Sequence, residues 1–584
     1  MTIMDVRPFL AVGVSLLAAI LIMFTGKKPN VRDFWSVAAA FIKCGLIFSM
    51  VPAVLAGNVY EWTLFQITDT LGFTLRTDPA GMVFACVSSF LYIPVSFYAI
   101  GYMRGHHEKE QTGFFAAFAV ALCAAIGIAL SANLLTFFVF YELLTIATWP
   151  LVFHARNEEA RFAGRKYLIY TLVCGQLFLA GIVMVYVFAG TLDFRAGGIL
   201  TIDMAPKWVL QLLFLLMILA GAVKAGVMPL HGWLPSAMVA PTPVSALLHA
   251  VAVVKAGAFC VLRVIGFVFG PELLAELGVA NILAWFAAFT IIASSLIAMQ
   301  QDNFKRRLAF STVGQLSYVV LGAALLAPYS ILGAYFHIVA HALMKITLFM
   351  CAGAVIVTTH KENISEMHGI GKQMPITMAC YTIAALGIAG MPFIIGFISK
   401  WNLALGALQI SQPFYIVILI CSALLSLGYL MPVSYLAFFK KNTEGNFKQF
   451  KEANKFMLVP ICVTAALSVI LGIFPNFGPH LYDLASMAAE AITVGWTGGW
   501  LVMFDKLTKK TIYIIIAVAV AASLVVEILF AHPHGHAIWD RVPGADIIIA
   551  FVGCWALILF SKKILAPLVQ RDEDYYDKED DDNE

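Results

Sequence analysis

The stretch VKAGVMPLHGWLPSAMVAPTPVSALLHAVAVVKAG, residues 223–257, carries the strongest signal in the chain. The tetrapeptide VKAG stands at both of its ends and places Lys224 and Lys255 in segments otherwise apolar enough to lie in a membrane. Four prolines and two histidines separate the lysines. A charge at membrane depth costs free energy, and prolines there interrupt helices. The simplest explanation is a protein that moves protons or cations.

The composition agrees with a membrane protein. Of the 584 residues, 61% are hydrophobic and 12% are charged, whereas about a quarter of a soluble globular protein is charged. No soluble domain of any size is left over. The net charge of +3 is too small to indicate nucleic acid as a partner. The first apolar run, 9–24, follows a short and poorly basic start, so it fits a retained helix better than a signal peptide.

The apolar runs predict an all-α polytopic fold. A spanning helix needs about 20 apolar residues. A weaker run at 481–503 and stronger ones at 512–530 and 546–565 would add two or three C-terminal helices. The core is predicted to have fourteen spans, near 8–25, 34–56, 80–101, 113–130, 132–153, 166–190, 208–230, 243–266, 280–299, 308–327, 330–357, 376–405, 413–439 and 456–474.

The distribution of Lys and Arg predicts the orientation in a prokaryotic cytoplasmic (inner) membrane. With the N-terminus outside, most basic loop residues and the cluster 440–455 lie inside. The acidic tail, RDEDYYDKEDDDNE from Arg571, lies inside only if 481–503 also spans. We interpret this tail as a disordered, solubilising end, with a docking site for a basic partner as the alternative. The outside loops would collect only Arg7, Arg76, Arg195, Lys207 and Arg263.

The cysteines argue against a metal or redox centre. All ten fall inside apolar runs, and no CxxC pair occurs. This excludes an iron–sulfur or zinc cluster of ordinary spacing. We therefore expect no cofactor, no metal and no redox centre in this subunit, even if it belongs to a larger oxidoreductase-type translocase.

Glu142 is a lone carboxylate in the apolar segment NLLTFFVFYELLTIATW. Such a group is rare in a spanning helix unless it is paired or hydrated. One interpretation is a fixed ion pair that locks two helices, and the other is a carboxylate that tunes a neighbouring lysine, with Lys224 as the candidate. At an effective dielectric of about 20, two charges about 4 Å apart interact by roughly 4 kcal/mol. Opening and closing such a pair would load and unload a proton.

Further titratable residues lie in the later spans. Lys255 sits too centrally to reach the membrane surface by snorkelling. His337, His341 and Lys345 are spaced by four, so they line one stripe of a helix. That stripe suits a proton relay through water, and a polar stripe bonded to facing helices is the alternative.

Lys400 closes LGIAGMPFIIGFISKW, in which Pro392 is predicted to break the helix. A lysine beside a break mirrors Lys224, which is followed by Gly226 and Pro229, and so suggests two related halves. Among the remaining intramembrane charges, we interpret Lys43 as structural or lipid-facing. Glu527 is interpreted as a contact with a partner subunit.

The segment PLHGWLPSAMVAPTPVSALLHAVAVVKAG resembles the signature of the antiporter-like membrane subunits shared by respiratory complex I, Mrp-type sodium/proton antiporters and membrane-bound hydrogenases. The resemblance covers about residues 80–440. It implies fourteen core helices, with inverted five-helix repeats at spans 4–8 and 9–13 and broken helices at spans 7 and 12. The expected domains are 1–112 (helices 1–3), 113–270 and 280–440 (the repeats), 455–567 (C-terminal helices) and 568–584 (acidic tail).

The resemblance also implies a role in proton translocation for seven residues. These are Glu142 and its partner Lys224, the central Lys255, the connecting His337, His341 and Lys345, and the terminal Lys400. The lysine at 400 and the wording APTPVSALLHAVAVVKAG favour the Mrp-like or hydrogenase-like branch. The segment GMPFIIGF departs from a more usual Gly-x-Pro-Pro start to the second break.

The leading hypothesis is a proton-translocating, antiporter-like subunit of a larger membrane complex, most simply a Mrp-type cation/proton antiporter. The alternatives are a pumping subunit of a complex I-like or hydrogenase-type oxidoreductase, a component that energises uptake of a substrate such as inorganic carbon, and a structural scaffold. The expected partners are other membrane subunits, the lipid bilayer, and protons with Na+ as a second candidate ion.

Overall fold

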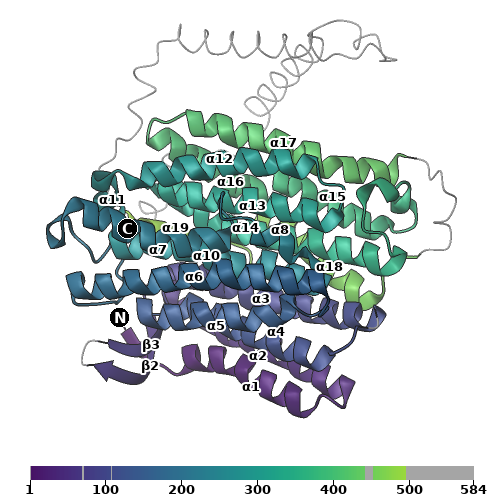
Figure 1. Cartoon of the computed structure of the whole chain (residues 1–584), viewed down its shortest axis with the longest axis horizontal. Helices are drawn as coiled ribbons and strands as arrows, with labels where there is room; N and C mark the ends of the chain where they lie inside the picture. The colour runs from purple at the N-terminus through teal and green to yellow at the C-terminus, as the bar shows by residue number, and fades with distance from the viewer. Residues whose placement is uncertain (1, 69–70, 107, 441–450, 495–584) are drawn as a thin grey trace, which may run out of the picture. The chain divides into compact units, whose positions relative to one another are not determined.

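The apolar runs of the chain form helices that lie roughly along one common direction (Figure 1). The structure, a computed structural model, describes residues 2–68, 71–106, 108–440 and 451–494. Helices suit a bilayer core, where no water is present to bond exposed backbone groups. Within these ranges, eleven helices are long and apolar enough to cross a membrane, or up to twelve if the bent pair Val253–Phe269 and Pro271–Leu277 is one span. The predicted helical membrane fold is confirmed.

Each of the fourteen predicted core segments is helical, although the number of crossings stays a prediction. The first seven correspond to α1 (Arg7–Phe24), α2 (Pro29–Leu55), α3 (Pro79–Gly105), α4 (Gln111–Leu130), α5 (Leu134–Val152), α6 (Glu158–Ala189) and α7 (Lys207–Ala225). The last six correspond to α12 (Val279–Met299), α13 (Phe304–Ala324), α14 (Pro328–Thr359), the pair α15 (Pro375–Ala389) and α16 (Ile395–Gln409), α17 (Phe414–Phe438) and α18 (Lys455–Ile473). Short helical pieces lie at η1 (Ile202–Met204), α8 (Trp233–Ser236), η2 (Ala237–Val239), η5 (Ile364–Glu366) and η6 (Ile370–Lys372).

The eighth predicted segment, 243–266, is not one regular helix. A π-helical turn inserts a residue into the helical ladder and often marks a functional position. The first such turn in this segment ends four residues before Lys255, and no feature of the sequence predicted it. The pieces are α9 (Thr242–Ala246), the π turn η3 (Leu247–Val251), α10 (Val253–Arg263), a second π turn η4 (Val264–Phe269) and, after an 89° bend, α11 (Pro271–Leu277).

The two predicted helix breaks are present. α7 ends at Gly226, whose φ of +79° suits glycine because other residues would strain there. The indole Nε1 of Trp233 donates to the carbonyl oxygen of Val223 at 2.8 Å, which satisfies one of the last carbonyls of α7. In the second half, α15 ends at Gly390, with φ +94°, and α16 begins five residues later. Both breaks therefore follow from glycine at a helix end.

A small sheet lies at the end of the helices near the N-terminus and was not predicted (Figure 1). β1 (Thr2–Met4) pairs in parallel with β2 (Val59–Thr68), which pairs antiparallel with β3 (Leu71–Arg76). The signal was present, because β2 reads VYEWTLFQIT, rich in aromatic and β-branched residues. The side chains of Glu61 and Arg76 form an ion pair at 2.6 Å across β2 and β3.

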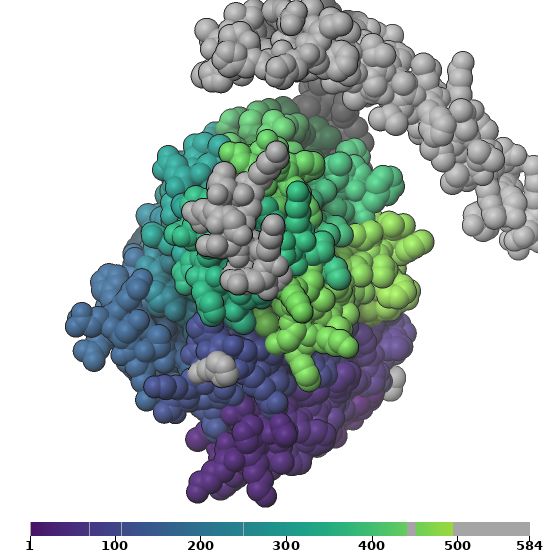
Figure 2. All heavy atoms as spheres, turned by 90° about the vertical axis from the view of Figure 1, so that its right-hand side faces the viewer, coloured from purple at the N-terminus to yellow at the C-terminus, as the bar shows by residue number. Residues whose placement is uncertain are grey.

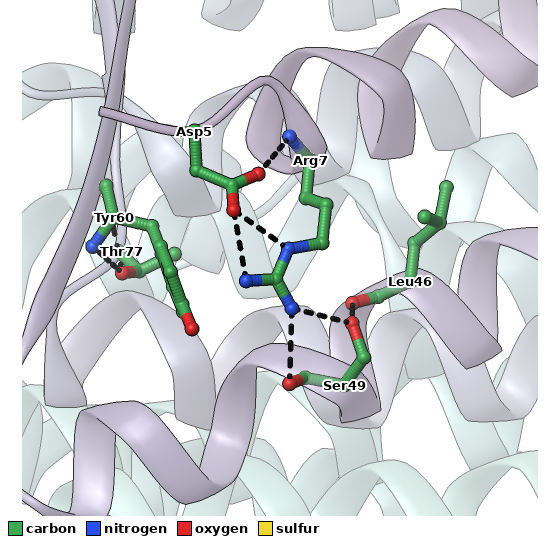
Figure 3. Close-up of polar contacts among 6 residues, drawn as sticks. All are labelled: Asp5, Arg7, Leu46, Ser49, Tyr60 and Thr77. Atoms are coloured by element: carbon green, nitrogen blue, oxygen red, sulfur yellow. Dashed lines mark hydrogen bonds and ion pairs between the residues drawn. The ribbon is translucent and has the colours of Figure 1, made fainter. Parts of the chain in front are cut away.

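Arg7 joins this sheet to the first two helices (Figure 3). Its Nη2 donates to Asp5 Oδ2 at 2.8 Å and its Nη1 to Ser49 Oγ on α2 at 3.3 Å. Its guanidinium lies 4.3 Å from the ring centroid of Tyr60 on β2, and the backbone N–H of Tyr60 donates to Thr77 Oγ1 at 2.8 Å. Hydrogen bonding from Arg7 holds the pKa of Asp5 below its usual value. These contacts fix where the chain begins its first helix.

The prediction that Arg263 lies in an outside loop is wrong. It is not in a loop but lies in α10 with 1% of its surface exposed. Its Nη2 donates to Asp78 Oδ1 at 2.9 Å, and the same Asp78 oxygen caps α3 by accepting from the N–H of Gly81 at 2.6 Å. A buried cation needs such a partner. Around the guanidinium lie the rings of Phe194, Phe259 and Phe267.

Lys43 is fully buried in α2, so the lipid-facing interpretation is wrong. Its Nζ donates to the carbonyl oxygen of Leu122 on α4 at 3.0 Å. The lysine therefore lies among α2, α3 and α4 within the described part of the chain.

The last helices of the described chain return to the first ones. Figure 2 faces the end of the helices opposite the sheet, and light-green residues of α18 lie beside the blue and purple N-terminal helices there.

The last described helix, α19 (Leu481–Ile492), falls within the weak predicted run 481–503. Its twelve residues are about 18 Å long at about 1.5 Å per residue, less than the roughly 30 Å of a hydrocarbon core. Its apolar face packs against α14 and α3. The predicted runs 512–530 and 546–565, Glu527 and the acidic tail 568–584 lie outside the described residues.

Candidate functional site

Lys224 lies at the C-terminal end of α7, directly before the break. Its side chain is 1% exposed. Its Nζ donates to the carbonyl oxygen of Tyr141 on α5 at 2.6 Å and lies 3.3 Å from the centroid of the Tyr141 ring. The Tyr141 hydroxyl in turn donates to the carbonyl oxygen of Ala220 at 2.8 Å. One tyrosine thus holds the ammonium by a carbonyl and a π face, and is itself anchored to α7.

Glu142, next to Tyr141, faces Lys224 closely enough for electrostatic attraction. The two do not form an ion pair at contact distance, and neither carboxylate oxygen has a hydrogen-bond partner among the described residues. On its other side the carboxylate lies against Gly175 of α6, where any Cβ would collide with it. The Glu142 carboxylate therefore lies near the buried lysine without contacting it.

Lys255 lies in α10 and is fully buried. Its Nζ and the Nδ1 of His341 on α14 are 2.5 Å apart, so they share a hydrogen bond. The π turn η3 ends four residues before this lysine and alters the direction in which α10 presents it. The contact joins the first half of the chain to the long central helix α14.

From His341 the polar groups continue along α14 and across to α16. The rings of His341 and His337 stack with centroids 6.0 Å apart. His337 Nδ1 lies 2.8 Å from Ser399 Oγ on α16, and its ring stacks on Tyr318 of α13 at 5.4 Å. The Nζ of Lys400 lies 4.8 Å from the centroid of Tyr318 and donates to the carbonyl oxygen of Ile388. The structure thus brings Lys255, His341, His337 and Lys400 into one row.

Lys345 lies beside this row. Its Nζ donates to the carbonyl oxygen of Leu308 on α13 at 3.2 Å, and its charge acts on that of Lys255. Lys224 and Lys255 lie on helices that approach each other closely. A Cβ on Gly257 would lie 2.7 Å from the Lys224 Cβ, so α7 and α10 cross at the first lysine.

A polar cleft of about 540 Å³ opens beside the break in α7. Lys166 Nζ donates to Ser236 Oγ at 3.1 Å and Lys305 Nζ to the carbonyl oxygen of Ala240 at 3.2 Å. His231, in the connection between α7 and α8, lies on its wall with an Nδ1 that has no partner among the described residues. Burial lowers the pKa of His231, so its imidazole is neutral near neutral pH. The cleft gives water a route to the broken helix.

Sequence reasoning missed Tyr141, Tyr318, Ser399 and His231. The signal for the tyrosines is a similar pattern in the two predicted repeats: YELL at 141–144 lies in α5 and YVVL at 318–321 in α13, each with its tyrosine under a lysine. The second copy has Val319 where the first has Glu142. Across the described ranges no group of three His, Cys, Asp or Glu side chains is placed to hold a metal ion.

The family described as "NADH:quinone oxidoreductase/Mrp antiporter, TM" matches residues 131–426, just over half of the chain and all of the row described above. The chain belongs to this family. This agrees with the resemblance of residues 229–257 and with the broken helices at Gly226 and Gly390. The roles of the seven predicted site residues remain predictions.

The relatives come from both branches of the family. The NADH-quinone oxidoreductase subunit N of Desulforudis audaxviator is 30% identical over 487 residues, covering 80% of this chain and 94% of that protein. One of the Na(+)/H(+) antiporter subunits of Alkalihalophilus pseudofirmus is also 30% identical, over 510 residues, covering 82% of this chain and 62% of that protein. A chain of the Mrp complex from Dietzia sp. has the same fold, with a TM-score of 0.73, 19% identity and coverage of 84% of this chain and 98% of that chain.

Proposed function

We propose that this chain is a proton-translocating subunit of a multisubunit membrane complex and that protons pass along its buried Glu, Lys and His residues. One observation carries the proposal: Lys255, His341, His337 and Lys400 follow one another in a buried row. Titratable groups inside a membrane domain are costly and mark ion or proton pathways. A scaffold would need paired charges, whereas these lysines bond to carbonyls, tyrosine rings and histidine.

Proton uptake is assigned to the cleft beside the α7 break. Lys166, Lys305 and Arg306 line it, and all three belong to the side predicted to face inside. The neutral His231 on its wall accepts a proton from water there. The break at Gly226 leaves Lys224 at a helix end, where water can approach the ammonium.

Loading of Lys224 is assigned to its contacts with Tyr141 and Glu142. When the Glu142 carboxylate swings toward the lysine, Coulomb attraction favours the ammonium form. When it stays in the open position seen here, the ammonium is held only by the Tyr141 carbonyl and ring. The switch between these states would bind and release one proton.

Transfer through the second half follows the observed row. Lys255 shares a hydrogen bond with His341, and the imidazole pair of His341 and His337 lies at a spacing that bridging water can span. A histidine exchanges protons near neutral pH. Ser399 and Tyr318 orient the His337 ring toward Lys400, which lies at the second break and would release the proton.

The partners and the orientation are proposed from the comparisons and the charge distribution. The chain would assemble with other membrane subunits, most simply in a Mrp-type cation/proton antiporter, with its N-terminus outside. The respiratory alternative is favoured by the subunit N relative, of which the chain covers 94%. Co-purification followed by identification of the neighbouring subunits separates the two, because only a respiratory complex brings quinone-reducing or hydrogenase partners.

Replacing Lys224 by Ala tests the proposal. We expect the complex to assemble and proton transport in vesicles to fall by about a hundredfold or more, since a positioned proton-transfer group contributes at least that much. The matched control is Lys207→Ala, an exposed lysine on the same helix. Full transport by the Lys224→Ala complex would refute the assigned role.

The charge-neutral double variant Glu142→Gln, Lys224→Met distinguishes transport from a scaffold role. If the two charges only held helices together, removing both would preserve transport and assembly. We expect assembly to persist and transport to be lost. Assembly is measured by co-purification, and transport by a pH-sensitive dye in vesicles.

A further inference from the structure

One buried lysine takes no part in the proposed pathway. Lys43 on α2 is fully buried, and its Nζ lies 5.5 Å from the centroid of the Tyr92 ring on α3. Its one hydrogen bond within the described part of the chain goes to the carbonyl oxygen of Leu122 on α4. An ammonium group has three N–H donors. Lys43 thus repeats the arrangement of Lys224, a tyrosine ring and a helix carbonyl, without a carboxylate beside it among the described residues.

Hydroxyl groups line the helices around this lysine. On α3, Ser88, Tyr92 and Ser96 are spaced by four and so share one face. On α2, Ser36 lies two turns before Lys43 on the same face, close to the Tyr92 hydroxyl. All four hydroxyls are buried and none has a well-formed hydrogen bond to the described protein. Buried hydroxyls without protein partners are usually satisfied by ordered water.

The column of hydroxyls starts at a charged cluster and ends at an apolar one. Asp33 lies one turn before Ser36, with 6% of its side chain exposed, and pairs with Arg32 at 2.7 Å and with the half-exposed Arg104. Beyond Lys43, the buried face of α2 continues with Ile47, Met50, Val51 and Val54. The column is therefore polar at the Asp33 end and apolar beyond Lys43.

We propose that Lys43 is a second proton-binding site of this subunit, reached by water from the Asp33 end through the hydroxyls of Ser36 and Tyr92. A proton arriving at this end converts the Lys43 amine to an ammonium, and it leaves by the same route. The site is separate from the central row, and its use of a buried lysine rests on the proposed function. Lys43 is hydrogen-bonded to α4 at the carbonyl oxygen of Leu122, and Gly127 of α4 packs against Phe140 of α5.

The groups that face Lys43 allow the protonation of this lysine to be measured apart from that of any neighbouring carboxylate. The titratable neighbours are Tyr92 on α3, Cys123 on α4 and Cys44 on α2. The buried face of α1 contributes a hydroxyl, Ser15, and no titratable group. Asp33, with Arg32 and Arg104, lies at the far end of the column. Lys43 is therefore the one basic group beside Tyr92, Cys123 and Cys44 in the described part of the chain, and it can lose its charge without leaving a carboxylate unpaired.

Thiol labelling tests whether the column is hydrated. Ser36→Cys and Met50→Cys are introduced in the assembled complex and treated with a charged, water-soluble methanethiosulfonate, with the native chain as background. Both positions are fully buried on α2, on opposite sides of Lys43. We expect labelling of Ser36→Cys and none of Met50→Cys. Equal labelling of the two, or none at Ser36→Cys, would overturn the proposal.

Transport measurements test whether Lys43 binds a proton during the cycle. Lys43→Met and Ser36→Ala are expected to lower the initial rate severalfold and to change its pH profile, and Lys43→Arg to restore part of the rate. The control Lys207→Met removes an exposed lysine whose Nζ also donates to a helix carbonyl, that of Glu276 at 2.9 Å. If Lys43→Met and Ser36→Ala both keep the native rate and profile, the proposal fails.

The two proposals can fail separately. If Lys224→Ala keeps full transport while Ser36→Cys is labelled, the central pathway is refuted and the hydrated column stands. If Lys224→Ala abolishes transport while Ser36→Cys stays unlabelled, the pathway stands and the second site is refuted. If Lys43→Met does not assemble, Ser36→Ala and the labelling still decide.

Discussion

At the scale of residues, one arrangement recurs three times. Lys43, Lys224 and Lys400 each lie over a tyrosine ring and donate to a helix carbonyl, without an ion pair at contact distance in the described part of the chain. A carbonyl and a π face attract the cation less than a contacting carboxylate would. Such a lysine can lose its charge without breaking an ion pair at contact distance, which suits a carrier of protons.

Tyr141 is predicted to matter through its ring rather than its hydroxyl. Tyr141→Leu removes a desolvated cation–π contact of about 2 kcal/mol from Lys224, so we expect slow transport. Tyr141→Phe keeps the ring and loses only the bond to Ala220, so we expect transport near the native rate. Initial rates of dye quenching in vesicles measure both, and equal rates in the two variants would contradict this role.

Asp78 is predicted to be essential for stability. Asp78→Ala leaves Arg263 as an unpaired buried cation, which typically costs about 3–5 kcal/mol, and removes the cap of α3, which costs about 1 kcal/mol more. The double variant Asp78→Ala, Arg263→Met removes both charges and should recover much of the loss. Thermal unfolding of the purified complex measures the difference. A double variant no more stable than the single one would argue against the pair.

At the scale of elements, glycine and proline made the two breaks predictable. Gly226 and Gly390 adopt left-handed backbone conformations at the ends of α7 and α15, and the sequence marks both positions. The π turn before Lys255 was not predictable, since LLHAV reads as ordinary helix and the extra residue depends on tertiary packing. The burial of Lys43 was missed for the same reason: its carbonyl partner is 79 residues away in sequence.

Gly257 is predicted to set the approach of α7 to α10. A Cβ there would lie 2.5 Å from the backbone nitrogen of Ala225 and 2.7 Å from the Lys224 Cβ. Gly257→Ala should therefore cost about 1–3 kcal/mol through overpacking and slow transport by displacing Lys224. The control Gly13→Ala lies in α1, where a Cβ would meet open space. It should neither destabilise the protein nor slow transport. Native transport by Gly257→Ala would show that this crossing tolerates a methyl group.

At the scale of the whole molecule, hydropathy, short motifs and charge predicted the architecture better than they predicted the local geometry. The helical segments and the family followed from the sequence, because apolar length and the 223–257 signature are read without tertiary knowledge. The pairing of Lys255 with His341 depends on contacts between distant helices, which spacing within one helix cannot reveal. The sheet at 59–76 was not predicted, because its strands of 10 and 6 residues are much shorter than a span of about 20 residues.

The predicted orientation can be tested from both sides of the membrane. Lys109 and Arg195 are both exposed, and the first is predicted inside and the second outside. In right-side-out vesicles, Arg195→Cys should react with an impermeant thiol reagent and Lys109→Cys should not. In inverted vesicles the result should be reversed. The opposite pattern would place the N-terminus inside.

The enclosure of α14 has a consequence for how the chain is made. Every residue of its most apolar window is buried, and it carries His337, His341 and Lys345. Its neighbours α3, α9 and α13 precede it in the chain, while α15, α16, α18 and α19 follow. When α14 leaves the ribosome, only half of its surroundings have been synthesised. The earlier helices must therefore shelter its three polar side chains from lipid until the later ones insert and close around it.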